Sequence, residues 1–110
     1  MNSKDQIICI IGLGYVGLPL AVEFGKSRKV IGFDLNSKRI SDLKKHYDFT
    51  KELESDEIAA AINLSFSSQK EDLKQASIFI VTVPTPIDHN NKPDLRPLLN
   101  ASEMVGHALK

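Results

Sequence analysis

The chain has 110 residues, the length of one domain, and its 14 basic and 14 acidic side chains leave a net charge of zero. Because neither sign forms a long block, the charge pattern favours neither a nucleic-acid nor a membrane surface, and a small-molecule ligand is expected. The single cysteine, Cys9, excludes an intrachain disulfide. The polar start MNSKDQ does not resemble a signal peptide, and no apolar run approaches the roughly 18 residues of a membrane span, so we expect a cytoplasmic protein.

The first element is an apolar run, Ile7–Ile11, which predicts a buried strand that stops at a glycine. Gly12, Gly14 and Gly17 follow with the spacing G-x-G-x-x-G, and a helical pattern begins between Tyr15 and Gly17. In a dinucleotide fold the first glycine permits a tight turn, the second leaves room for a pyrophosphate, and the third lets the helix lie close to the sheet. The unpaired N–H groups of the helix N-terminus would then face the phosphates.

A second apolar run, Val30–Phe33, ends at Asp34, which lies 22 residues beyond Gly12. A carboxylate in this place can accept both ribose hydroxyls of an adenosine. It would also repel a 2′-phosphate, so NAD is preferred over NADP. The three glycines alone are weak evidence, but the strand before them, the helix after them and the acid supply the context that the motif requires.

The next predicted helix begins at Asn36, a good N-cap residue, and runs to about Lys45. Its spacing predicts one buried stripe, made of Ile40, Leu43 and Tyr47. Arg39 lies in its first turn. Its guanidinium could reach the adenosine end of a nucleotide bound at Asp34, or it could be a solvated surface arginine, and the sequence leaves both open.

Two further strands are expected, giving four strands in an α/β sheet that is parallel and doubly wound in the order 3-2-1-4. A loop over 46–55 and a short helix over 56–62 precede the third strand at Leu64 to Phe66, and Ser68 with Glu71 predicts a capping box for a brief helix. The fourth strand, Ile78–Val83, reads as buried on both faces. It ends at Pro84 and Pro86, which makes Thr85 between them a candidate cofactor contact, although an idle hydroxyl in a stiff turn is an equal alternative.

The last predicted helix is capped by Asp94 and has an apolar stripe made of Leu95, Leu98, Val105 and Leu109. A complete dinucleotide fold has six strands, so we interpret residues 1–110 as a Rossmann-like domain, truncated and forming the front portion of a longer enzyme. The fourth strand would then have an unpaired outer edge. We expect self-association through this edge, giving a homo-oligomer.

Four segments together resemble the N-terminal region of the UDP-glucose/GDP-mannose dehydrogenase family: IGLGYVGLPLAVEFGK, VIGFDLNSKRI, IFIVTVPTPID and PDLRPLLNASEMVG. The resemblance covers nearly the whole chain. The LPL after the glycines and the later VTVPTP are most similar to the branch that oxidises UDP-N-acetylhexosamines for bacterial surface polysaccharides. The family resemblance implies an NAD-dependent oxidation of the C6 alcohol of a UDP-sugar, through an aldehyde, to a carboxylate.

The resemblance also implies roles for individual residues. The glycine turn of Gly12, Gly14 and Gly17, with Tyr15 and Val16, would hold the pyrophosphate. Asp34 and Arg39 would hold the adenosine ribose, and Thr85 would contact the cofactor. The catalytic cysteine, lysine and glutamate of the family are expected beyond this chain, and Cys9 does not match the nucleophile.

One departure from the family pattern is the sequence Lys45-His46-Tyr47, where relatives often have a glycine. This departure puts the geometry of the following loop in question, but it does not affect the expected cofactor site. Two other classes of protein share parts of this pattern. A stand-alone, non-catalytic nucleotide-sensing domain would share the strand, the glycine turn and the acid, whereas a methyltransferase that binds S-adenosylmethionine is disfavoured by the regular G-x-G-x-x-G spacing.

Overall fold

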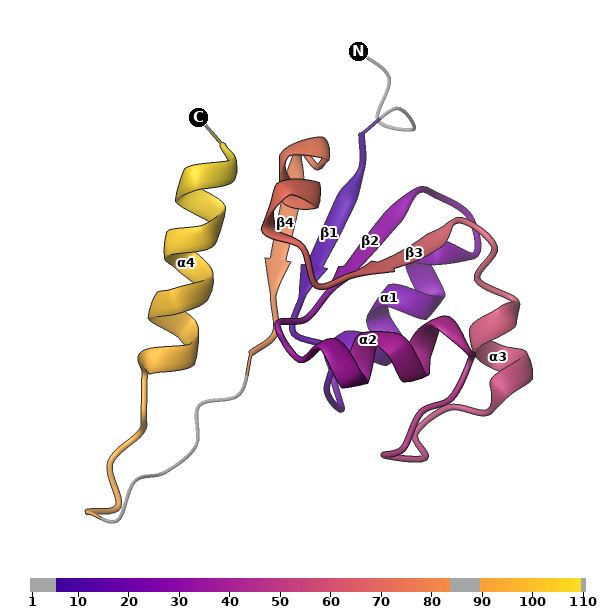
Figure 1. Ribbon diagram of the computed structural model, residues 1–110, viewed down its shortest axis with the longest axis horizontal. Helices are drawn as coiled ribbons and strands as arrows, with labels where there is room; N and C mark the ends of the chain where they lie inside the picture. Colours follow the sequence, from indigo (N-terminus) through magenta and orange to yellow (C-terminus); the bar gives the residue numbers. More distant parts are fainter. Residues whose placement is uncertain (1–5, 84–89, 110) are drawn as a thin grey trace.

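The computed structural model describes residues 6–83 and 90–109. Figure 1 follows the chain through its strands and helices; η2 among the described elements is a 3₁₀-helix. In chain order the elements are β1 (Ile8–Ile11), α1 (Gly17–Gly25), β2 (Val30–Phe33), α2 (Ser37–Lys44), α3 (Ser55–Ala59), β3 (Leu64–Ser67), η2 (Lys70–Gln75), β4 (Ile78–Val81) and α4 (Arg96–Ala108).

The strands form one parallel sheet in the order β3-β2-β1-β4, which confirms the predicted topology. Ile8 of β1 pairs with Val30 of β2 on one side and with Ile78 of β4 on the other, so the three strands end level with one another. Their carboxyl ends therefore meet at one edge of the sheet. In doubly wound folds this edge is where ligands bind.

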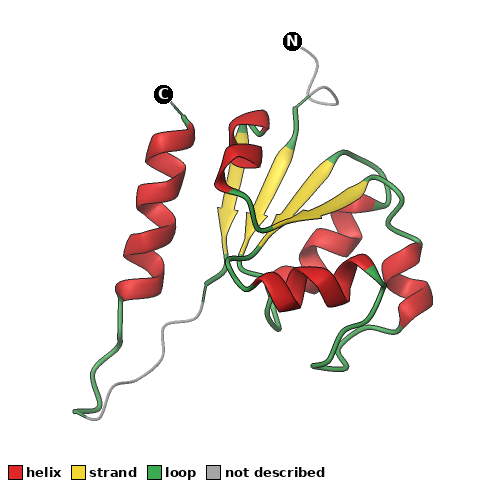
Figure 2. Cartoon of the chain, in the orientation of Figure 1, coloured by secondary structure: helices red, strands yellow, loops and turns green. Residues whose placement is uncertain are grey.

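The two faces of the sheet are covered by different helices, as Figure 2 shows. Helices α1, α2 and α3 pack against one face through a core that includes Ile8, Ile10 and Val30. The opposite face carries Cys9 and Ile11, and it is covered by Leu73 of η2 and by the Ala101 side of α4. Side chains along β1 and β4 alternate between these cores, which is why these two strands read as continuous apolar runs, whereas β3 places Leu64 and Phe66 on one core only.

Strand β4 is less buried than the sequence predicted. All four of its residues are half-buried, and among the described residues its only strand neighbour is β1. Its side chains do pack against both cores, Ile78 and Ile80 on one face and Phe79 and Val81 on the other, so the prediction of two covered faces holds but that of full burial is wrong. An edge strand with apolar side chains leaves backbone N–H and C=O groups without partners on its outer side.

Helix α2 begins and ends as its capping residues dictate. The Asn36 side chain accepts hydrogen bonds from the N–H groups of Lys38 and Arg39, which confirms the predicted N-cap. Beyond the helix, His46 has a φ of 63°. The N–H groups of His46 and Tyr47 donate to the carbonyls of Leu43 and Asp42 respectively, which is the Schellman arrangement usually closed by a glycine.

Several local predictions are wrong. Tyr47 lies beyond the end of α2 and is exposed, so it does not extend the buried stripe of Ile40 and Leu43. No capping box forms at Ser68, since η2 has Gln69 as its N-cap without a side-chain hydrogen bond. The predicted cap of α4 does form, although the helix begins at Arg96 with Leu95 as its N-cap residue: the Asp94 Oδ1 accepts a hydrogen bond from the N–H of Arg96 at 3.0 Å. The predicted stripe of α4 is wrong at three positions, which are exposed: Leu95, Leu98 and Leu109.

Candidate functional site

The turn after β1 depends on Gly12, which has a φ of +97°. A Cβ at this residue would also lie 3.0 Å from the carbonyl carbon of Thr82 and 3.1 Å from the N of Val83. The residue thus needs both left-handed backbone and a close approach to the chain leaving β4, and only glycine meets both needs. This is the tight turn predicted from the sequence.

Gly17 and Gly14 serve different physical purposes. A Cβ on Gly17 would lie 1.8 Å from the carbonyl O of Gly12 and 2.4 Å from the hydroxyl of Thr82, so α1 reaches the turn only because this residue is glycine. A Cβ on Gly14 would meet no described atom within 4 Å. The fold therefore requires Gly17 but leaves open space at Gly14.

Neither a capping side chain nor an acidic residue of its own first turn neutralises the positive end of the α1 helix dipole. Its N-cap, Val16, makes no side-chain capping bond, and no acid lies in the first turn. Within residues 6–83 and 90–109, no group accepts a hydrogen bond from the N–H of Gly14, Tyr15 or Val16. The side chains of Tyr15 and Val16 are exposed. These free donors and the helix dipole suit an anion.

Asp34 faces the glycine turn. Its Oδ2 accepts a hydrogen bond from the N–H of Leu13 at 3.0 Å, and its Oδ1 accepts one from the N–H of Asn36 at 3.0 Å. The carboxylate is only partly buried. Each oxygen can accept further hydrogen bonds, so the acid remains able to bind hydroxyl groups.

A cavity of about 250 Å³ opens beside this carboxylate, at the carboxyl ends of β1 and β2. Gly12, Asp34 and Val83 line one part of it, and Pro97 and Asn100 of α4 line another. Its position at the strand ends matches the ligand crevice of doubly wound sheets.

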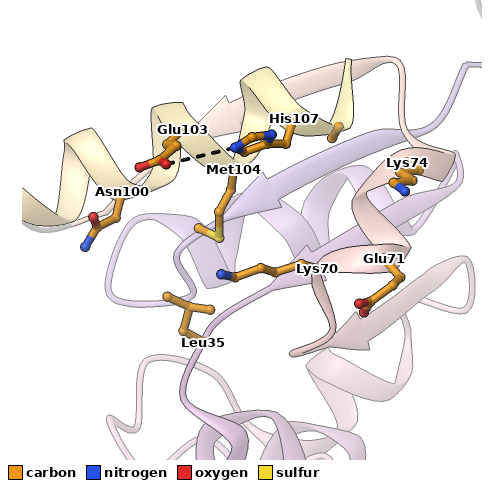
Figure 3. Close-up of a pocket in the computed structure, with 9 residues that line it drawn as sticks. Leu35, Lys70, Glu71, Lys74, Asn100, Glu103, Met104 and His107 are labelled. Carbon is orange, nitrogen blue, oxygen red and sulfur yellow. Dashed lines mark ion pairs between the residues drawn. The ribbon is translucent and has the colours of Figure 1, made fainter. Parts of the chain in front are cut away.

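A second cavity of about 500 Å³ lies between η2 and α4, and Figure 3 shows its side chains. Leu35 and Met104 line both cavities, and Met104 reaches from α4 toward Leu35 and Lys70. The walls carry charges of both signs, and Glu103 lies 3.9 Å from His107, with which it forms an ion pair only when the imidazole is protonated. These mixed charges single out no one ligand.

Arg39 is buried, with 4% of its surface exposed, so the alternative of a solvated arginine is wrong. Its Nε and Nη2 donate to the carbonyl O of Leu13 at 2.9 and 2.6 Å. Its Nη1 donates to Asp48 at 2.7 Å. Arg39 thus contacts the carbonyl of the same residue of the glycine turn whose N–H donates to Asp34. Whether it also contacts a nucleotide stays a prediction.

Asp48 is a residue that the sequence did not single out. Its buried carboxylate pairs with Arg39 and accepts hydrogen bonds from the backbone N–H and the hydroxyl of Thr50, and from the N–H groups of Glu52 and Leu53. Burial raises the pKa of this carboxyl, but the hydrogen bonds from Thr50, Arg39 and Leu53 outweigh burial and hold the pKa below its ordinary value. It is ionised at neutral pH.

Thr82 was also missed. Its hydroxyl donates to the carbonyl O of Gly12 at 2.6 Å, and its N–H donates to the carbonyl O of Ile11 at 2.8 Å. It therefore joins the end of β4 to the glycine turn. The one signal in the sequence was its place at the end of the fourth strand. The predicted contact Thr85 and the prolines beside it lie outside the described residues.

Two other functional possibilities find no support in this part of the chain. Burial raises the pKa of the Cys9 thiol to about 12, so the thiol stays protonated and unreactive, as expected for a small core residue. Across residues 6–83 and 90–109, no group of three or more His, Cys, Asp or Glu side chains could hold a metal ion. No described helix is long and apolar enough to cross a membrane.

Comparison with known protein families decides the identity of the fold. Residues 6–110 match the UDP-glucose/GDP-mannose dehydrogenase family, NAD binding domain. The chain belongs to this family. The resemblance found in the sequence is therefore confirmed, and the domain is an NAD-binding domain.

Individual members of the family agree. The UDP-N-acetyl-D-glucosamine 6-dehydrogenase of Pseudomonas aeruginosa is 53% identical over 107 residues, which cover 97% of this chain and 25% of that protein. The enzyme of the same name from Salmonella typhi is 56% identical over 110 residues, covering 99% and 26%. The solved structure of a UDP-D-ManNAc dehydrogenase from Pyrococcus horikoshii is 29% identical in sequence and has a TM-score of 0.85. The match covers 94% of this chain and 26% of that protein. The chain thus spans about a quarter of the length of each of these relatives.

Proposed function

We propose that this chain is the cofactor domain of a nucleotide-sugar dehydrogenase that oxidises the C6 alcohol of a UDP-N-acetylhexosamine to a uronic acid. Two relatives above 50% identity carry the name UDP-N-acetyl-D-glucosamine 6-dehydrogenase, which supports UDP-N-acetylglucosamine as the first substrate to test. NAD supplies the chemistry by accepting a hydride in each of two oxidation steps. The product would serve surface polysaccharide synthesis in the cytoplasm.

The residues around the glycine turn fit NAD. The space beside Gly14 and the free N–H groups of Gly14, Tyr15 and Val16 suit a diphosphate, and Gly12 and Gly17 shape the turn. Asp34 would accept the hydroxyls of the adenosine ribose at the mouth of the 250 Å³ cavity. We also propose that Arg39 supports the glycine turn through its two hydrogen bonds to the carbonyl O of Leu13, and that Thr85, which follows β4 in the sequence, contacts the cofactor.

One observation carries this assignment. The Leu13 N–H donates to Asp34 Oδ2 at 3.0 Å, so the acid and the glycine turn form one hydrogen-bonded unit. A carboxylate that faced elsewhere, or a side chain occupying the space at Gly14, would have been incompatible with a bound dinucleotide. Neither is present among the described residues.

Titration calorimetry with NAD and NADP tests the cofactor site. We expect the chain to bind NAD at least about tenfold more tightly than NADP, because Asp34 repels the 2′-phosphate. Asp34→Asn should weaken NAD binding and reduce the difference in affinity between NAD and NADP. Asp42→Asn is a matched control, since Asp42 is an acid on α2 whose partner is the exposed Lys38. Equal affinity for both nucleotides, or no binding of either, would refute the role of Asp34.

The substrate is tested with the complete gene product. We expect NADH formation with UDP-N-acetylglucosamine, two molecules per sugar, and little with UDP-glucose. NAD binding without NADH formation from any UDP-sugar would instead favour the non-catalytic, nucleotide-sensing alternative.

A further inference from the structure

The peptide groups on both sides of Leu13 are held in place. The N–H of Leu13 donates to Asp34, and its carbonyl O accepts two hydrogen bonds from the guanidinium of Arg39. Leu13 itself is 1% exposed. Charged side chains therefore fix this residue through both of its backbone groups, and it lies in the middle of the G-x-G sequence.

The carbonyl of Leu13 and the N–H of Gly14 belong to one peptide group. In a trans peptide these two bonds point in opposite directions, and the described chain contains no cis peptide. Because the carbonyl is turned toward the buried Arg39, the N–H of Gly14 is turned away from it, on the exposed side of the turn. Two charge-assisted bonds to the carbonyl also polarise the peptide and strengthen its N–H as a donor.

Arg39 is in turn held by Asp48. The arginine fork is oriented by the 2.7 Å pair with this carboxylate and by Phe49, whose ring centroid lies 5.2 Å from the guanidinium carbon. Four further hydrogen bonds from residues 50–53 anchor the carboxylate. The ion pair leaves no net charge to act on a ligand directly, so any effect on binding passes through the peptide.

The loop that supplies Asp48 is strained. His46 and Lys51, on either side of it, both have positive φ, at 63° and 60°. Such residues persist only where surrounding contacts impose the conformation. At His46 these contacts are the two hydrogen bonds that close α2, and at Lys51 they are the bonds that the Asp48 carboxylate accepts from the N–H groups of Thr50 and Glu52. The loop after α2 is therefore a rigid support for Arg39.

We propose that Asp48 and Arg39 are positioning residues for the diphosphate of a bound nucleotide. Asp48 orients Arg39, and Arg39 fixes the Leu13–Gly14 peptide so that the Gly14 N–H donates to a phosphate oxygen. This inference rests on the proposed function, because it needs a nucleotide at the glycine turn. It differs from the family expectation that Arg39 contacts the ribose.

The test compares ligands that share adenosine but differ in the diphosphate. Binding of NAD, ADP and adenosine is measured by calorimetry, with ligand-detected NMR for weak cases. The main variant is Arg39→Met with Asp48→Asn, which removes both charges together and so leaves no unpaired buried ion. Arg39→Lys is a second variant that keeps the charge but cannot reproduce the fork. Glu23→Gln with Lys26→Met is the control, because it removes an exposed ion pair at the far end of α1.

We expect the double variant to lose about tenfold in affinity for NAD and for ADP, the loss associated with one hydrogen bond to a charged group, while adenosine changes less than about twofold. Arg39→Lys should fall between the double variant and the wild type, and the control should match the wild type. In the free proteins, the Gly14 amide proton should move upfield in the double variant, since its peptide is less polarised.

Two outcomes would overturn the inference while leaving the proposed function intact. One is an equal loss for NAD, ADP and adenosine, which would indicate a purely structural role for the pair. The other is a Gly14 amide resonance that does not move in either Arg39 variant. Failure of the wild-type chain to bind NAD or ADP would refute the cofactor site itself, and with it the proposal that depends on it.

Discussion

Replacing Gly17 with alanine adds one methyl group where helix α1 lies against the glycine turn. The new Cβ would lie 1.8 Å from the Gly12 carbonyl O and 2.4 Å from the Thr82 hydroxyl. Neither atom can give way easily, because the first is backbone and the second donates to the same carbonyl at 2.6 Å. Helix α1 would therefore have to move by more than an ångström from the turn.

Overpacking of a close contact costs about 1–3 kcal/mol, and we expect Gly17→Ala to lie near 3 kcal/mol because the obstructing atom is backbone. The gain in helix propensity, about 1 kcal/mol at most, is smaller. For a domain of this size the net loss should lower Tm by roughly 10 °C or more. Thermal unfolding followed by circular dichroism measures it.

Gly14→Ala is the matched control for this substitution. It adds the same methyl group three residues earlier, where no described atom lies within 4 Å. We expect its Tm to stay within about 2 °C of the wild type, since surface changes of this kind are usually worth less than 0.5 kcal/mol. Its NAD affinity should nevertheless fall, because the methyl enters the space assigned to the diphosphate. A Gly17→Ala protein as stable as Gly14→Ala would refute the reasoning.

Three further predictions concern stability and association. His46→Gly should raise the free energy of unfolding by about 1 kcal/mol, because glycine accepts the φ of 63° without strain, whereas His46→Ala should not; urea denaturation distinguishes them. Since the pKa of Asp48 is lowered on folding, its contribution should be present above about pH 4 and be lost as pH falls through the lower folded pKa. Asp48→Asn should flatten this acid dependence in urea melts at several pH values and cost about 3 kcal/mol at neutral pH, and an unchanged acid slope would contradict it. The open edge of β4 should cause concentration-dependent association in sedimentation experiments, and a monomer at high concentration would count against it.

The strands and the glycine turn were predictable because their signals are local. Strands β1, β2 and β4 are apolar runs, β3 alternates leucine and phenylalanine with serines, and the parallel order follows from the alternation with helices. The acid after β2 faces the turn because parallel neighbours end level, as the pairing of Ile11 with Phe33 shows. These parts of the site required no knowledge of distant contacts.

The buried ion pair could not be predicted, because its partners are linked only in three dimensions. Arg39 occupies a helical position that is usually solvated, and Asp48 lies in a loop without recognisable periodicity. The burial of α4 was missed for a different reason. The sequence pattern favours its large leucines, but the helix approaches the sheet through Ala101, with Met104 and Val105 beside it, because a small residue permits close packing.

The buried pair also bears on cofactor selectivity. Dinucleotide folds that accept NADP place an arginine where its charge can meet the 2′-phosphate. Here the arginine closest in sequence to Asp34 is Arg39, and it is buried against Leu13 and neutralised by Asp48. Arg39 is therefore not available to offset the carboxylate of Asp34 or to meet a 2′-phosphate. We expect a preference for NAD over NADP from two features together, an acid at the end of β2 and an arginine whose hydrogen bonds are made to Leu13 and Asp48.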